Sequence, residues 1–301
     1  MDFPSVTSRL LFGLTVASMA WSVRAQESPA LTVESQRQHV QLEHDVQTFA
    51  HQAIVRPPAT YNQSLERWNV PVCPQVAGLD RAKGEFLLSR LSTIAKTAGV
   101  PLAGENCSAN FIVFVSAEPE PLLKKMIKQR NLFDGNEDKG ELNDFVTNPR
   151  PVRIWRNIYL TTIDGSQHLK AHGEKQYNNE PHSTSLPSMY GSRLFVAAVT
   201  RDIASAIVVV DASKVTELNI GQLGDYVGLI GFAQVNLDEQ ITNVPTILNL
   251  FRLPRDTRPQ EMTKWDKALL QGLYSSAQRD VTQISQLESI AVRELEIRPS
   301  P

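Results

Sequence analysis

Three of the six histidines lie in the stretch QHLKAHGEKQYNNEPH, residues 167–182. His168 and His172 are four positions apart, a spacing at which two side chains share one face of a helix or a strand, and His182 follows them. Imidazole is a common zinc ligand, so His168, His172 and His182 form a candidate metal site for a hydrolase. However, the peptidase motif H-E-x-x-H requires glutamate where Leu169 stands. The glycine, asparagine and proline content favours a loop without metal.

No other catalytic template is complete in the sequence. We find no dinucleotide-binding G-x-G-x-x-G, no phosphate loop and no G-x-S-x-G nucleophile turn. The stretch PSMYGSR, residues 187–193, carries three hydroxyl groups that could bind a ligand, but a polar loop entering a strand explains it more simply. We therefore predict no cofactor and no catalytic residue, and we leave open whether the protein is an enzyme.

Residues 131–150 are rich in acidic and amide side chains, which suggests calcium. A helix-loop-helix calcium site needs glycine at position 6 and glutamate at position 12 of its loop. Counted from Asp134, those positions hold Lys139 and Phe145. The template fails, and the sequence predicts a solvated loop instead.

The N-terminus has the pattern of a signal peptide. Arg9 precedes an uncharged apolar run, residues 10–21, and the small residues Val23 and Ala25 occupy the −3 and −1 positions of a cleavage site. The run is too short to cross a hydrocarbon core of about 30 Å as a helix. We predict cleavage after Ala25 and a periplasmic or secreted bacterial protein without an integral membrane segment. An uncleaved anchor is the alternative.

The composition is that of a folded domain without a strong net charge. Hydrophobic residues make up 42% of the chain, and the formal net charge is −2 at pH 7. A nearly neutral protein exerts no long-range electrostatic attraction on nucleic acid or anionic lipid, so we predict that it binds neither in this way. We predict a signal peptide over 1–25 and a single α+β domain over 26–301. Its expected partner is an unknown protein or a component of the cell envelope.

The chain contains two cysteines, Cys73 and Cys107. Export to an oxidising compartment favours a disulfide between them. In the chain-entropy model, closing this loop stabilises the fold by roughly 3.5–4 kcal/mol. Two buried free thiols are the alternative, because spacing alone does not show that the two residues approach within bridging distance.

The pattern of apolar residues predicts helices through much of the chain. The clearest begins after Asp80 and ends before Gly99, which are typical residues for the two caps, and Phe86 is expected on its apolar face. A later helix contains glycines three or four apart, which indicates that another backbone approaches closely. The predicted helices cover residues 32–53, 80–98, 121–130, 219–236, 259–276 and 279–296.

Apolar and β-branched runs predict a small mixed or antiparallel sheet. Residues 110–116 indicate a strand covered on both faces, and residues 152–162 an edge strand or a half-exposed strand. Two further runs, 193–200 and 204–211, are separated by only a few residues, which predicts an antiparallel hairpin. Together with the helical C-terminal third, these elements predict the α+β class.

Several motifs resemble an uncharacterised family of exported bacterial proteins. They are C-P-x-V-x-G-L in VCPQVAGL, the segment AKTAGVPLAGENCSANFIVFVS, IVVVDASKV, and the D-Y to A-Q helix in QLGDYVGLIGFAQ. The similarity covers roughly residues 70–250. It supports pairing Cys73 with Cys107 and the order strand, hairpin, glycine-rich helix. It implies no activity, since the family has none assigned.

The order of elements is also broadly similar to that of zincin metallopeptidases, whose active-site helix follows the last strands. The corresponding helix here would be 222–234, and it presents Asp225, Tyr226 and Gln234 where zinc ligands and a base would be needed. Any such kinship would be with a non-catalytic relative. We therefore expect a non-enzymatic binding or envelope-associated domain. The alternative is a metal-dependent hydrolase or a degenerate zincin-like relative.

Overall fold

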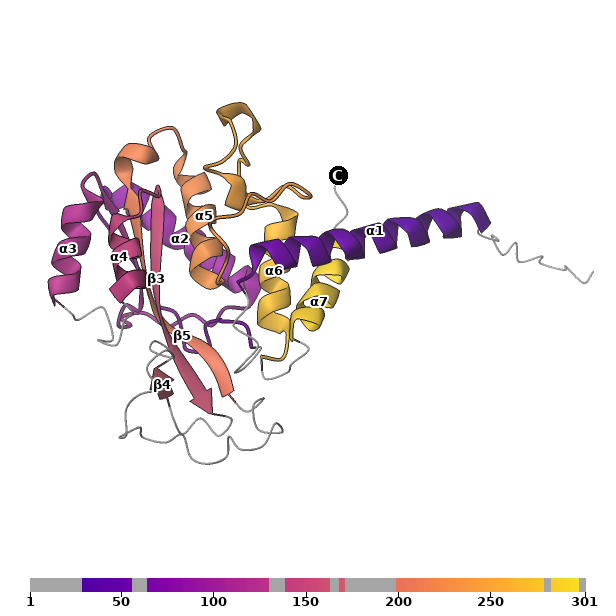
Figure 1. Cartoon of the computed structure of the whole chain (residues 1–301), viewed down its shortest axis with the longest axis horizontal. Helices are drawn as coiled ribbons and strands as arrows, with labels where there is room; N and C mark the ends of the chain where they lie inside the picture. The colour runs from indigo at the N-terminus through magenta and orange to yellow at the C-terminus, as the bar shows by residue number, and fades with distance from the viewer. Residues whose placement is uncertain are drawn as a thin grey trace, which may run out of the picture. The chain divides into compact units, whose positions relative to one another are not determined.

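The computed structural model describes residues 29–55, 64–129, 139–162, 168–170, 199–278 and 283–297 (Figure 1). The chain divides into two units, Met1–His39 and Val40–Pro301. The described part of the first unit is the beginning of helix α1, Pro29–Ala53, which confirms the helix predicted over 32–53. The sheet and the helices that cover it belong to the second unit.

One mixed sheet forms the centre of the second unit, with the strand order β1-β2-β5-β3-β4. Strands β1, β2 and β5 are parallel, β3 is antiparallel to β5, and β4 is antiparallel to β3. The strand bounds are β1 Pro74–Ala77, β2 Phe111–Ser116, β3 Val152–Thr162, β4 His168–Lys170 and β5 Val199–Asp211. The strands predicted over 110–116 and 152–162 and the α+β class are therefore confirmed. However, β3 lies between β5 and β4 and most of its described side chains are buried, so it is neither an edge strand nor half-exposed.

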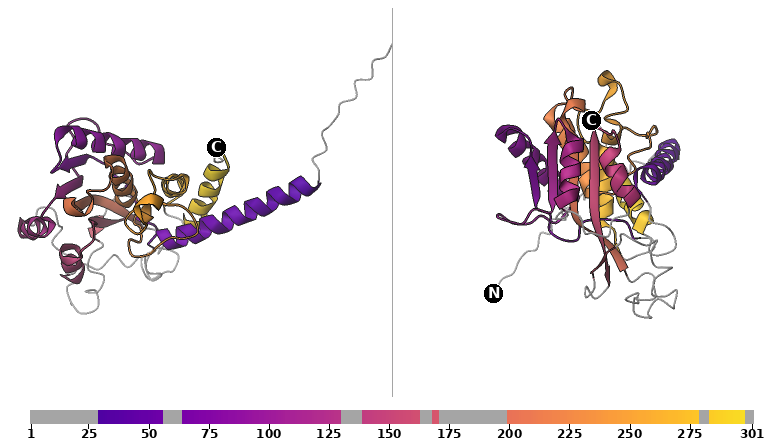
Figure 2. Two further views of the ribbon diagram at one scale, coloured as in Figure 1. Left: turned by 90° about the horizontal axis from the view of Figure 1, so that it is seen from above. Right: turned by 60° about the vertical axis from the view of Figure 1, so that its left-hand side comes forward.

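Helices cover both faces of this sheet (Figure 2). Helices α2 and α5 pack on one face, and α3 and α4 on the other. Helices α6 and α7 follow in the C-terminal part and pack on each other. Their bounds are α2 Arg81–Ala98, α3 Pro119–Gln129, α4 Lys139–Thr147, α5 Ile220–Phe232, α6 Lys264–Ser275 and α7 Gln283–Ile297, with short 3-10 turns at Ala212–Lys214, Ile247–Asn249 and Arg255–Thr257.

Strand β5 supplies both cores because successive side chains point to opposite faces of a sheet. Val208 and Val210 belong to the large cluster on the side of α2 and α5. Ile207 and Val209 belong to the smaller cluster on the side of α3 and α4. All four are at most 2% exposed. Because both faces of this part of the strand are buried, its sequence is a continuous apolar run rather than an alternating one.

The predicted hairpin over 193–200 and 204–211 is wrong. Residues 193–198 lie outside the described part of the chain, but β5 runs without a turn from Val199 to Asp211. The polar residues between the two apolar runs lie inside this strand and pair with β3.

Contacts from residues 64–69, before β1, explain how the charged residues Arg201 and Asp202 are accommodated within β5. Arg201 forms an ion pair with the buried Glu66, with Nη2 at 2.7 Å from Oε1. Asp202 accepts a hydrogen bond from Asn69, and the backbone of Arg67 pairs in parallel with it. Because these polar groups have partners, the strand continues through them.

Two local predictions are also corrected. Residues 139–147 were expected in a solvated loop, but they form helix α4, whose Phe145 packs on Trp155 of β3 with ring centroids 5.7 Å apart. Phe86 was expected on the apolar face of α2, but it is 48% exposed. The remaining apolar positions of α2, among them Leu87 and Leu91, are buried as predicted.

The ends of α2 follow the prediction closely. The Asp80 side chain accepts a hydrogen bond from the Lys83 backbone, and Gly99 adopts a left-handed conformation with φ of 83°. Glycine adopts left-handed conformations at a lower free-energy cost than other residues, because it lacks a Cβ atom. The sequence therefore defines both ends of this helix through its own local chemistry.

Candidate binding site

Helix α5 is buried from Gln222 to Phe232. Its carboxylate, Asp225, has no exposed surface, and it accepts two hydrogen bonds from the guanidinium of Arg90 on α2. The same carboxylate accepts a hydrogen bond from the backbone N–H of Met262, with Oδ2 2.6 Å from the nitrogen. Asp225 therefore joins α2 and the segment that leads into α6.

The glycines of α5 allow its neighbours to approach. A Cβ atom at Gly224 would lie 3.1 Å from side-chain atoms of α2, and one at Gly228 would lie 2.6 Å from the Ile94 side chain. At Gly231 it would lie 2.2 Å from the ring of Phe111 on β2. We expected an approaching backbone. The atoms in contact belong instead to side chains.

Large side chains close the C-terminal end of α5, where helical carbonyl groups lack intrahelical partners. The indole N–H of Trp68 donates to the carbonyl of Gly231 at 2.8 Å, and the hydroxyl of Tyr274 donates to the carbonyl of Phe232 at 2.7 Å. Arg156 donates to two further carbonyl groups of this turn. These contacts fix α5 against the sheet and α6.

The residues of α5 do not fit a zinc centre. The oxygens of Asp225 are occupied by a cation, Arg90, which would repel a second cation. Tyr226 is buried edge-on against Phe251, and burial raises its pKa to about 12, so its hydroxyl stays protonated at neutral pH. Gln234 follows the helix end, and its carbonyl accepts from Val55. The zincin comparison thus yields no catalytic group here.

The histidine site stays a prediction. His168 is the first residue of β4 and pairs with Thr161 of β3. His172, His182 and the stretch 187–193 lie outside the described residues. Among the residues that the structure does describe, no group of three or more His, Cys, Asp or Glu side chains could hold a metal ion.

A hollow of about 760 Å³ lies beside α5, between two loop segments that connect α5 to α6. Its walls are residues 240–246 on one side and residues 257–264 on the other, closed by Asn249, Leu253 and Lys267. This volume is within the range of small-molecule sites in proteins, roughly 300–1,000 Å³. The pocket is our candidate binding site.

A second buried carboxylate, Asp266 of α6, holds one wall to the other. It accepts hydrogen bonds from the Thr246 hydroxyl at 2.5 Å, the Ile247 N–H at 2.9 Å and the Thr263 N–H at 2.8 Å. Burial raises the pKa of Asp266, and these hydrogen bonds act in the opposite direction. Asp266 and Thr263 also form the capping box that begins α6.

Asn249 also holds the wall formed by residues 240–246. Its side chain accepts from the Ile241 N–H at 3.2 Å and donates to the Ile241 carbonyl at 2.5 Å, in place of a paired strand. Gln222 of α5 donates to the carbonyl of Pro259 at 2.9 Å on the opposite wall. The pocket is therefore built from loops whose backbone is held by buried side chains.

The open surface of the pocket combines amide and hydroxyl groups with apolar ones. Gln240, Thr242, Asn243 and Gln260 are all exposed. Among the apolar lining residues, Pro245 is exposed and Leu253 and Pro259 are half-buried, whereas Ile241, Val244 and Met262 are at most 5% exposed. The charged lining residues are Glu261, Lys264 and Lys267. The surface can donate and accept several hydrogen bonds, and it also offers apolar area.

A smaller hollow of about 480 Å³ lies between α4 and β3. Arg153 lines it, but this side chain is buried and donates to the Val146 carbonyl and to Glu120. Arg150, the other cation of the lining, forms an ion pair with Asp238. These arginines hold α3, α4 and the loop after α5, so we interpret the hollow as structural.

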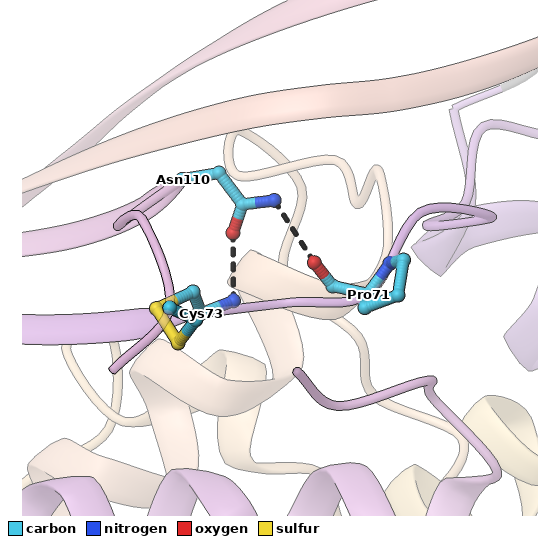
Figure 3. Close-up of a disulfide and its surroundings, with 4 residues drawn as sticks. Pro71, Cys73 and Asn110 are labelled. Atoms are coloured by element: carbon cyan, nitrogen blue, oxygen red, sulfur yellow. Dashed lines mark hydrogen bonds between the residues drawn. A yellow bond between two sulfur atoms is a disulfide. The ribbon is translucent and has the colours of Figure 1, made fainter. Parts of the chain in front are cut away.

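The predicted disulfide is present. Cys73 and Cys107 are bonded, with their Cα atoms 6.0 Å apart (Figure 3). Cys73 directly precedes β1, and Cys107 lies in the loop before β2. Asn110 reinforces the link, because its side chain accepts from the Cys73 N–H at 2.7 Å and donates to the Pro71 carbonyl at 3.1 Å.

Comparison with known proteins gave no assignment. No model of a protein family, no curated protein and no solved structure matches the chain. Within the described part of the chain, no helix is both long and apolar enough to span a membrane.

Sequence reasoning did not find the pocket. Its lining comes from irregular loops, and neither their amides nor Lys264 and Lys267 form a recognisable motif. The one available signal was the set of polar residues Gln222, Asp225 and Tyr226 inside an otherwise apolar helix. An ionisable residue in such a run indicates a buried partner, but the sequence does not identify Arg90 as that partner.

Proposed function

We propose that this chain is an exported bacterial protein that binds a ligand or partner without catalysing a reaction, and that the loop pocket is its binding site. The main support is the state of the two carboxylates that frame the pocket. Asp225 and Asp266 are both fully buried, and both are engaged by donors of the protein itself. A general base or a nucleophile has to reach the substrate, which neither group can do.

The same contacts favour binding. Walls that are already held in place lose little conformational freedom when a ligand enters, which improves affinity. The disulfide between Cys73 and Cys107 supports an oxidising compartment, as the predicted signal peptide does. Export and the absence of catalysis remain parts of the proposal.

The test uses the chain from residue 26 to 301, purified without chelator. We expect no turnover of a panel of peptide, ester and glycoside substrates. Turnover that is abolished by a single polar substitution would contradict the proposal. Asn143→Ala, at an exposed position of α4 away from the pocket, is a suitable control for nonspecific effects of substitution.

A second candidate is a degenerate zincin-like relative or a metal-dependent hydrolase. The position of α5 directly after the last strand of a mixed sheet favours the first form. The second form would use His168, His172 and His182. Elemental analysis distinguishes it: stoichiometric metal in the wild-type chain, lost in a triple His→Ala variant, would support a metal centre, and metal content unchanged in the variant would exclude these histidines.

A further inference from the structure

The outer edge of β1 is a self-complementary surface, and residues 101–107, which we call the cover segment, lie along part of it. We infer that this edge pairs with the same edge of a second copy of the chain when the bond between Cys73 and Cys107 is reduced. The inference goes beyond the proposed binding function, because no residue of the edge lines the loop pocket. It follows from the direction of the backbone groups, the contacts of the cover segment and the exposure of one sulfur atom.

The register between β1 and β2 determines which backbone groups point outward. Phe111 donates its N–H to the Cys73 carbonyl, and Phe111 is the register partner of Pro74. In a parallel pair of strands, the backbone groups of alternate residues point toward the same neighbour. Those of Cys73 and of every second residue after it therefore point toward β2. Those of Val72, Pro74 and Val76 point toward the outer edge.

The cover segment occupies only the first of these outer positions. Val72 donates its N–H to the Pro101 carbonyl and accepts from the Ala103 N–H, both at 2.9 Å. Pro74 has no N–H to offer. Val76 makes no backbone hydrogen bond on the outer side within the described part of the chain. The edge therefore has two equivalent positions, of which one is covered.

These two positions are symmetric about Pro74. When two copies align antiparallel with Pro74 opposite Pro74, Val72 of each copy faces Val76 of the other, and each such pair can exchange two backbone hydrogen bonds. The contact has twofold symmetry, the commonest symmetry of protein oligomers. Charged side chains on an edge strand prevent such pairing. Residues 70–79 contain none, so the two copies do not repel each other there.

Few contacts besides the disulfide hold the cover segment at the edge. Residues 104–107 are exposed, and Leu102 is only half-buried against the large core cluster. When the cover segment leaves, Val72 loses two hydrogen bonds. Pairing with a second copy replaces both of them and adds a partner for Val76. The exchange therefore leaves no backbone group of Val72 without a partner.

The exposure of the two sulfurs determines how reduction proceeds. Cys107 is exposed, whereas Cys73 is 6% exposed, so a reductant reaches the Sγ of Cys107. A thiolate of a dithiol reductant attacks this atom, the bond to Cys73 breaks, and Cys73 leaves as a thiolate that takes up a proton. The second thiol of the reductant then displaces Cys107 from the mixed disulfide. The chain gains two thiols, and the reductant becomes a disulfide.

The test measures mass by light scattering and backbone amide hydrogen exchange for the chain from residue 26 to 301. We expect one chain per particle in the oxidised protein and two after reduction with dithiothreitol. After reduction the Ala103 amide should exchange at least about tenfold faster, because it loses its acceptor, and the Val76 amide more slowly, because it gains one. The amide of Val208, in the centre of the sheet, should keep its protection and so show that the fold is intact.

Two substitutions of one residue test the backbone contact itself. Val76→Pro removes the outward N–H, which an edge strand tolerates, and should keep the reduced chain monomeric. Val76→Thr retains that N–H and is the matched control, so it should dimerise like the wild-type chain. The exchange pattern of the wild-type chain tests the same contact without any substitution.

Three results would overturn the inference. The first is a reduced chain that is folded but monomeric, and the second is an equal mass for the two reduced Val76 variants. The third is loss of protection at Val208 on reduction, because the disulfide would then hold the whole fold rather than the cover segment.

Discussion

Asp225 and Arg90 are unequal partners. Asp225 is fully buried, whereas the side chain of Arg90 keeps 32% of its surface exposed. Removing the carboxylate leaves a guanidinium that water can reach. Removing the guanidinium leaves a buried carboxylate with one hydrogen bond, from Met262. Only the loss of Arg90 therefore leaves an unpaired buried charge, and this loss should cost more free energy than the loss of Asp225.

We accordingly predict that Arg90→Met destabilises the fold by about 3 kcal/mol and that Asp225→Asn costs less, about 1–2 kcal/mol. Urea unfolding followed by circular dichroism measures both. Arg81→Met is the control, because that arginine is 91% exposed and its pair with Glu85 should contribute little. Equal losses in the two main variants would show that burial does not decide the energetics of this pair.

Glu120 gives a prediction about pH. The hydrogen bond from Arg153 holds the pKa of Glu120 below its ordinary value of 4.5. A carboxylate with a lowered pKa in the folded state stabilises the fold above its unfolded pKa, and this stabilisation is lost as pH falls through the folded value. In Glu120→Gln the decline of unfolding free energy below pH 4.5 should be less steep. Urea titrations between pH 6 and 3 measure it, and a slope equal to that of the wild-type chain would contradict the prediction.

Helices α2 and α5 differ in what their glycines do. A Cβ atom at Gly84 of α2 would have no neighbour within 4 Å, whereas one at Gly231 of α5 would meet the ring of Phe111 at 2.2 Å. Gly84 thus lowers helix stability without any packing benefit, while Gly231 makes room for a rigid side chain. Sequence spacing alone does not separate these two cases.

Alanine substitution should therefore act with opposite sign at the two positions. We predict that Gly84→Ala stabilises the fold by about 0.5–1 kcal/mol. Gly231→Ala should destabilise it by about 2 kcal/mol, because the ring of Phe111 has to move. Thermal and urea unfolding of both variants test this, and a stabilising Gly231→Ala would contradict the packing described for α5.

Elements that are defined by their own residues were predictable, and those defined by distant partners were not. Helix α2 carries its cap residues within its sequence. Helix α4 is polar along most of its length and depends on three apolar residues, Leu142, Phe145 and Val146, packed in the smaller cluster. Strand β5 contains Arg201 and Asp202, which predict a turn in the sequence. They lie within the strand because residues 64–69 supply their partners, and the sequence does not indicate those partners. The pocket was missed for the same reason, because Asp266 and Asn249 bind loops that have no pattern of their own.

At the scale of the whole molecule, the disulfide restrains the segment that carries α2. It joins residues 34 positions apart and holds the start of β1 near the start of β2. Cys73→Ala with Cys107→Ala should lower the unfolding free energy by about 4 kcal/mol in the chain-entropy model. Urea unfolding measures the loss, with intact mass confirming the oxidised state of the wild-type chain. A loss below about 1 kcal/mol would mean that the loop is already restrained by Asn110 and its neighbours.

The place of β5 in the sheet has a consequence for folding kinetics. Its parallel neighbour β2 ends at Ser116, and β5 begins only at Val199, so the centre of the sheet closes across a long stretch of chain. Long-range parallel pairing slows folding because a large loop must close before any contact compensates for it. The folding chain cannot complete this sheet until β5 has reached β2. Until β5 pairs with it, one edge of β2 stays unpaired, and such an apolar edge makes a partly folded chain prone to aggregation.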